Sequence, residues 1–170
     1  MTMLRSHLDY AVSIWSPHHK AIIEDIEKVQ KRATKMVYSC KKMSYTERLQ
    51  FLSLPTLAYR RIRGDMIEVF NILNGKYDEQ VAPNLKMSQN VRTRGNTFKL
   101  ETLRARYDRR KYFFTDRIVC VWNSLPDIVV NAASVDSFKE NLDSFWSGEP
   151  LFYDFKACLS CIGARGILAQ

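Results

Sequence analysis

The residues best able to do chemistry in this 170-residue chain are cationic, and they fall into two blocks. Positions 28–63 hold ten basic residues against the single acid Glu47, a local charge of +9. Positions 92–117 hold nine basic residues against three acids, a local charge of +6. Because the whole chain carries only +8, the remaining sequence is negative overall. Such segregation of positive charge is typical of a protein that binds a polyanion, most often nucleic acid.

We therefore predict that cations of both blocks contact nucleic-acid phosphates, a role that needs charge but no reading of base identity. The predicted contact residues are Lys28, Lys31, Arg32, Lys35, Lys41, Lys42, Arg60, Arg61, Arg104, Arg106, Arg109 and Arg110. Three aromatic residues, Tyr107, Tyr112 and Phe113, lie among the arginines of the second block. They fit stacking on bases, but we favour their packing in a core.

Catalytic patterns are not found in the sequence. Nucleotide transfer needs two metal ions held by clustered carboxylates, yet the chain has no Asp-Asp pair, and its adjacent acids lie at positions 24–25 and 78–79. The pair His18-His19 has no third ligand within helical reach, and Cys158 with Cys161 forms one Cys-x-x-Cys pair without a second. Phosphate-binding and hydrolase motifs are also absent. We expect no catalytic residue, metal, cofactor or small-molecule substrate.

The chain start does not read as a secretion signal, because Arg5, His7 and Asp9 interrupt its apolar residues. No stretch approaches the length of apolar sequence that spans a membrane. The composition, 46% hydrophobic and poor in Gly and Pro, is that of a folded domain. We expect an intracellular protein of the nucleus or cytoplasm, neither secreted nor in a membrane, whose four cysteines stay reduced.

The elements that must position the cations read as helices. From Ile22 to Tyr38, apolar residues recur within one arc of a helix, and Lys28, Lys31 and Lys35 fall on the opposite face. The apolar arc, predicted to face the core, contains Ile22, Ile26, Val29, Ala33, Met36 and Val37.

Capping signals delimit further helices. Ser44 and Glu47 form a capping box for a short helix over 45–51, and Thr56 caps the next helix, which Asn74-Gly75 ends. Apolar stripes predict a helix from Phe114 that stops before Pro126 and another that begins after Ser134. Weak alternation over 98–104 indicates a short strand or hairpin.

These elements predict a mainly α fold in four parts. Residues 1–76 form a helical domain, residues 77–97 a loop or linker, and residues 98–147 a smaller helical region with the short β-hairpin. Residues 148–170 show no periodicity and form a tail that is a candidate for disorder.

Several short strings occur in an ordered set along the chain. They read LDY at 8–10, WSP at 15–17, KVQKRATKM at 28–36, LPTLAYRR at 54–61 and WNSLP at 122–126. In this order and spacing, the set resembles the region that follows the polymerase palm in reverse transcriptases of non-LTR retrotransposons of the LINE-like, Jockey and CR1 type. The resemblance spans roughly residues 4–146.

The resemblance implies that residues 4–73 form a helical thumb, which in this family grips the template–primer duplex of RNA and DNA. Lys31, Arg32 and Lys35 would then face duplex phosphates, while Leu8, Tyr10 and Trp15 would pack the first helix on its neighbours. Residues from about 92 to 146 resemble the trailing C-terminal region of the family. The fingers and palm of such an enzyme would be natural partners.

The expected function is that of a truncated fragment of a retrotransposon RNA-directed DNA polymerase. It binds template–primer nucleic acid through a basic helical surface but lacks the palm active site, so the chain alone should not extend a primer. One alternative is a helical protein-interaction module derived from a retroelement, with no nucleic-acid role. Another is a stand-alone basic DNA-binding domain, although no helix-turn-helix with a short glycine turn is evident.

Overall fold

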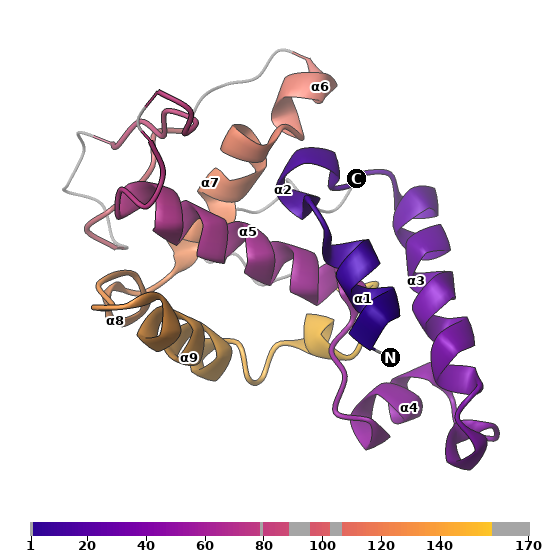
Figure 1. Ribbon diagram of the computed structural model, residues 1–170. Helices are drawn as coiled ribbons and strands as arrows, with labels where there is room; N and C mark the ends of the chain where they lie inside the picture. Colours follow the sequence, from indigo (N-terminus) through magenta and orange to yellow (C-terminus); the bar gives the residue numbers. More distant parts are fainter. Residues whose placement is uncertain (1, 79, 89–95, 103–106, 158–170) are drawn as a thin grey trace. The chain divides into compact units, whose positions relative to one another are not determined.

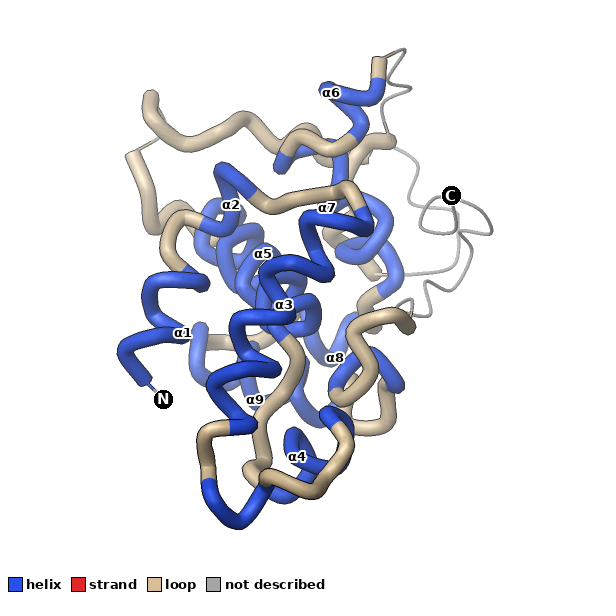
Figure 2. Tube along the Cα trace, turned by 90° about the vertical axis from the view of Figure 1, so that its right-hand side faces the viewer, coloured by secondary structure: helices blue, strands red, loops and turns tan. Residues whose placement is uncertain are grey.

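The computed structural model describes residues 2–78, 80–88, 96–102 and 107–157, and these are mainly helical (Figure 1). The expected mainly α class is confirmed. No strand occurs within the described ranges (Figure 2). In place of the expected hairpin, a single antiparallel bridge joins Met87 and Leu100.

The chain forms two compact units. Among the described residues, unit 1 combines 2–64 with 148–157, and unit 2 comprises 65–147. The division falls within one helix, between Gly64 and Asp65, and not in the segment 77–97 predicted as a linker. Of the predicted tail, residues 148–157 belong to unit 1, whereas 158–170 lie outside the described residues.

Unit 1 is built from short helices, and within it α3 packs on both α4 and the short turn η1. Its elements are α1 (Thr2–Asp9), α2 (Val12–Trp15), α3 (Lys20–Lys35), the 3-10 turn η1 (Tyr38–Cys40), α4 (Tyr45–Phe51), the first half of α5 (Leu57–Leu73) and the 3-10 turn η2 (Pro150–Phe152).

The predicted capping box of α4 is confirmed, since the Glu47 backbone N–H donates to Ser44 Oγ at 3.3 Å and the Ser44 N–H donates to Glu47 Oε2 at 2.7 Å. Thr56 caps α5 as predicted, its Oγ1 accepting from the Tyr59 N–H at 3.1 Å. At the other end of α5, Gly75 adopts a φ of 66°, the left-handed conformation that ends a helix.

The segment after Gly148 is held by the start of α5. The Thr56 backbone N–H donates to the Phe152 carbonyl at 2.9 Å, and its hydroxyl donates to the Leu151 carbonyl at 2.7 Å. The Tyr59 and Phe152 rings lie 4.8 Å apart. This segment shows no periodicity in its sequence because backbone pairing and the aromatic contacts of Phe152 and Phe155, not a repeating apolar stripe, hold it.

The core-facing side of α3 differs from the prediction. Glu27, Gln30 and Thr34 are its buried residues, whereas Val29 and Met36, predicted to face the core, are exposed. Ile22 is exposed as well. The reason is that buried partners on α4 and α5 require polar acceptors and donors, which an apolar residue cannot supply. Hydrogen bonding to distant partners therefore places Glu27 and Gln30 on the buried face of α3, while Ile26, Ala33 and Val37 of the predicted arc are half-buried.

Unit 2 has an aromatic core. Its elements are the second half of α5, α6 (Asp108–Lys111), α7 (Phe114–Ser124), α8 (Asp127–Val130) and α9 (Val135–Phe145). Trp122 of α7 stacks with Phe138 of α9 at a centroid distance of 6.0 Å, and Phe138 stacks with Phe70 of α5 at 4.4 Å. Ser134 caps α9 as predicted, accepting from the Ser137 N–H at 3.1 Å. No helix in the described ranges is long and apolar enough to cross a membrane.

Candidate nucleic-acid interface

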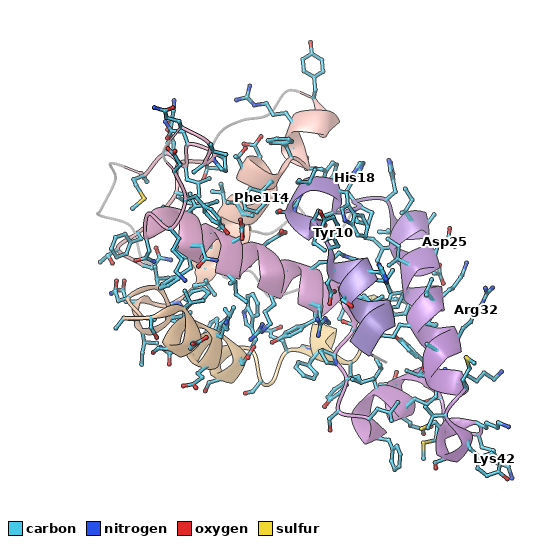
Figure 3. The ribbon with its side chains drawn as sticks, in the orientation of Figure 1. Tyr10, His18, Asp25, Arg32, Lys42 and Phe114 are labelled. Carbon is cyan, nitrogen blue, oxygen red and sulfur yellow. The ribbon has the colours of Figure 1, made fainter. Side chains whose placement is uncertain are left out.

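Four of the predicted contact residues form an exposed cationic stretch in unit 1, which we call the α3–η1 basic surface: Arg32, Lys35, Lys41 and Lys42. None of these four makes an ion pair with a residue that the structure describes. Figure 3 shows Arg32 and Lys42 projecting outward from the ribbon. Positions 28–46 contain six basic residues and no acid, and although Lys28 pairs with Asp25, the local field is strongly positive.

The backbone beneath this surface is held in place. The Met36 N–H donates to Ala33 and the Val37 N–H to Thr34, which closes the end of α3. The turn η1 follows, with the Cys40 N–H bonded to the Val37 carbonyl at 3.0 Å. Cys40 itself is fully buried and anchors the turn. The cations therefore project from a fixed scaffold, which lowers the entropy lost on binding.

Two other cations of α3 have partners within unit 1. Lys28 Nζ lies 2.8 Å from Asp25 Oδ1, and this hydrogen bond raises the pKa of Lys28. Lys31 is half-buried, with its Nζ 4.3 Å from the Phe155 ring centroid and 5.2 Å from that of Tyr45. The predicted placement of Lys31 opposite the buried face is therefore wrong, since Lys31 shares that face with Glu27 and Gln30.

The arginines at the start of α5 also serve internal contacts. Arg60 is half-buried, and its guanidinium pairs with Asp9 of α1, with Nε donating to Oδ2 at 2.9 Å. Arg61 is buried near Glu27. Both remain predicted contact residues, but the fold gives them a structural role: Arg61 is buried, and the guanidinium of Arg60, whose side chain is 36% exposed, already pairs with a carboxylate.

The second block is described only in part. Arg104 and Arg106 lie outside the described residues, as does the side chain of Arg109, whose backbone is in α6. Arg110 is exposed, with its Nε 3.7 Å from Asp116 Oδ2. Arg117, by contrast, is half-buried and forms two hydrogen bonds with Asp65, at 3.0 and 2.9 Å. Within the described part of this block, Arg110 is the predicted contact that remains open.

The sequence analysis favoured core packing for the aromatic residues of the second block, but they do not lie in the core. Tyr107 is 78% exposed and Phe113 is 61% exposed, while Tyr112 is half-buried with Lys111 Nζ 5.3 Å from its ring centroid. The core of unit 2 is supplied instead by side chains of α5, α7 and α9. Two aromatic rings therefore stand beside Arg110 in sequence and remain open to a ligand.

A buried polar cluster lies beneath the α3–η1 basic surface. Glu27 is fully buried, and its carboxylate accepts hydrogen bonds from the Tyr45 hydroxyl and, at 3.2 Å, from the Leu57 N–H. Gln30 Nε2 donates to Tyr45 Oη and to the Pro55 carbonyl, both at 3.1 Å. The cluster joins α3 to α4 and satisfies a donor at the N-terminus of α5, which fixes the helix that carries the cations.

Burial raises the pKa of Glu27, while the hydrogen bonds from Tyr45 and Leu57 and the charges of Arg61 and Lys31 act in the opposite direction. A carboxyl whose folded pKa is raised contributes stability below its ordinary value of 4.5, and this stability is lost as the pH rises through the folded pKa. The stability of the native protein should therefore fall, relative to that of Glu27→Gln, as the pH rises above the ordinary carboxyl value of 4.5.

Urea unfolding of the two proteins across this pH range measures the difference. Glu27→Gln keeps an acceptor for Tyr45 and Leu57 but removes the titration, so it isolates the effect of the charge. If the stability of the native protein instead rises relative to that of Glu27→Gln as the pH rises, the charge of Arg61 favours the carboxylate more than burial penalises it.

Metal-ligand groups do not gather in the described part of the chain, where no cluster of three His, Cys, Asp or Glu residues could hold an ion. The rings of His18 and His19 lie 4.0 Å apart at the start of α3. Cys158 and Cys161 lie outside the described residues.

Sequence reasoning missed one exposed residue of the candidate interface, Tyr38. The pattern placed it at the end of the predicted helix, but it begins η1 and is 84% exposed. Its position between Lys35 and the pair Lys41-Lys42 was the available signal, because an aromatic residue among cations is a common feature of nucleic-acid surfaces.

Comparison with known proteins adds no family assignment. No protein-family model matches the chain, no curated protein matches it significantly, and no solved structure does so either.

Proposed function

We propose that this chain binds nucleic acid through phosphates, using the α3–η1 basic surface as its main contact. The proposal extends to a thumb-like role, in which the surface holds the template–primer duplex of a non-LTR retrotransposon reverse transcriptase. This thumb-like role is supported by the ordered set of short strings in the sequence. The chain offers no paired catalytic carboxylates, so the proposed role is binding and not nucleotide transfer.

One observation carries the proposal: Arg32, Lys35, Lys41 and Lys42 are exposed together, and no described acid pairs with them. Basic residues that only solubilise a surface are usually interspersed with acids. Arg32 and Lys35 also lie in the last turn of α3, where they complement the helix dipole. That effect accounts for two of the four cations, but Lys41 and Lys42 lie beyond the helix end and require another explanation.

The test is the salt dependence of binding. Four phosphate contacts should give a log–log slope of affinity against salt of about −4 for duplex DNA, with little preference for sequence. Fluorescence anisotropy of a labelled duplex across a salt series measures the slope. The absence of binding even at about 50 mM salt would overturn the proposal.

A second candidate function has an observation of its own. Tyr10, which precedes α2, and Ile14 and Trp15, which lie within it, are exposed large side chains. Adjacent exposed apolar residues are typical of protein interfaces. If the salt series shows no binding, a helical protein-interaction module becomes the better explanation of this chain.

A further inference from the structure

Tyr38 occupies an unusual position for a large aromatic residue. It begins the turn η1 and is 84% exposed, although the chain on both sides of it is tied down. The Lys41 N–H bonds back to the Tyr38 carbonyl at 3.4 Å, and the Met43 N–H bonds to the Cys40 carbonyl at 3.2 Å. The ring therefore stands out from a fixed turn whose neighbour Cys40 is buried. A tyrosine held in this way loses little conformational entropy on binding, since it has only two side-chain torsions.

The surroundings of this ring are cationic. Lys41 Nζ lies 4.9 Å from the Tyr38 ring centroid, and Lys35 and Lys42 are exposed within four residues along the chain. The side chain of Met36 is exposed as well. The combination is an aromatic face surrounded by phosphate-binding charges, which is the arrangement that binds single-stranded nucleic acid.

We infer that Tyr38 stacks on an unpaired nucleobase, so that the α3–η1 basic surface binds a junction between duplex and single strand in preference to a continuous duplex. This inference rests on the proposed function, because the neighbouring cations must hold the phosphates beside the base. The ligand class is a duplex of RNA or DNA with a single-stranded overhang.

The choice of an unpaired base follows from geometry. Within a duplex both faces of each base are covered by its neighbours, so an exposed ring can reach a base face only at an end or in a single strand. The phosphates flanking that base would meet Lys35, Lys41 and Lys42. A protein partner is a weaker match, since one docking on Tyr38 and Met36 would have to place acidic groups against every surrounding cation.

The experiment uses the full chain and two oligonucleotide ligands of equal phosphate number. One is a blunt duplex, and the other is a duplex with a short overhang that carries 2-aminopurine at its first unpaired position. Stacking of a tyrosine ring on 2-aminopurine quenches its fluorescence. We compare the native protein with Tyr38→Leu, which removes the aromatic face, and with Tyr38→Phe, which keeps it. Tyr10→Leu is the matched control, because Tyr10 is 78% exposed but lies outside the basic surface.

The native protein and Tyr38→Phe should quench the probe and bind the overhang ligand more tightly than the blunt duplex. Tyr38→Leu should lose the quenching and about 5-fold or more of the overhang affinity, while its circular dichroism stays unchanged and its affinity for the blunt duplex, which exposes a base face only at its two ends, falls less. Tyr10→Leu should behave as the native protein. Blunt-duplex binding with no quenching, or equal overhang affinity in Tyr38→Leu, would overturn the stacking inference alone. Failure to bind either ligand would overturn the proposed function as well.

Discussion

Replacing Trp122 by alanine should lower the free energy of unfolding of unit 2 by about 3 to 5 kcal/mol. Trp122 is fully buried on α7, in the apolar stripe that also contains Phe114, Ile118 and Leu125. Truncation would remove its stacking on Phe138 and leave a cavity in the aromatic core. Because small domains are stable by only about 5 to 15 kcal/mol, a loss of this size threatens the whole unit.

A hydrogen-bond loss adds to this cost. The indole Nε1–H of Trp122 donates to the Phe98 carbonyl at 2.8 Å, and the Trp122 carbonyl accepts from Asn96 Nδ2 at the same distance. The indole thus joins the segment before α6 to α7. Trp122→Phe keeps most of the ring contact but removes the donor, so its loss should be smaller than that of Trp122→Ala.

Chemical unfolding followed by circular dichroism and by tryptophan fluorescence measures both effects, because the buried Trp146 remains in each variant beside the exposed Trp15. Phe145→Ala is the matched control, since Phe145 is an aromatic residue of α9 that is exposed. Its loss should stay below about 1 kcal/mol. An unchanged unfolding midpoint in Trp122→Ala would contradict the place of the indole in the core.

The helices could be predicted wherever their signals are local. The capping box of Ser44 and Glu47, the cap of Ser134 and the stop at Gly75 all depend on residues within four positions of one another. Such contacts are determined by spacing alone, so the sequence is sufficient to find them. The short elements α6, α8 and η2 were not predicted, because one turn of helix is too short to show periodicity.

The buried face of α3 could not be predicted in the same way. Hydrophobicity points to Val29 and Met36, but the fold buries Glu27 and Gln30. The partners of these two side chains, Tyr45 and the N-terminus of α5, lie 15 to 30 residues away in sequence. A helical wheel considers only the residues of one helix and not such distant donors, so it predicts that this buried glutamate faces solvent.

The same limit applies to the predicted contact residues. Local charge located the cationic stretch as a group, yet it could not separate the exposed Arg32 and Lys35 from their half-buried neighbour Lys31. Lys31 differs from them because Phe155, more than a hundred residues later, lies beneath its ammonium group. Arg60 likewise pairs with a distant acid, Asp9. Which cations stay open is decided by tertiary contacts.

The separation of open from internally paired cations leads to the second large expected effect. Replacing Arg32, Lys35 and Lys42 together by glutamate should weaken duplex binding by at least about 100-fold at about 0.1 M salt, and should reduce the salt slope by about 3. Each phosphate contact contributes about 0.9 log unit at this salt concentration through counterion release, and the new carboxylates add repulsion. All three side chains are exposed, so the fold should persist, which circular dichroism checks.

The control for this variant must have the same net charge but leave the α3–η1 basic surface unchanged. Lys20, Lys76 and Lys86 are exposed lysines outside the α3–η1 basic surface, and their replacement by glutamate also lowers the net charge from +8 to +2. If binding depends on the placement of the cations, the control keeps most of its affinity and its salt slope stays near the native value. If both triple variants lose affinity equally, the attraction comes from the overall charge and the α3–η1 basic surface is not the contact. If neither triple variant loses affinity, the interface lies instead in the second block, where Arg110, Tyr107 and Phe113 are exposed.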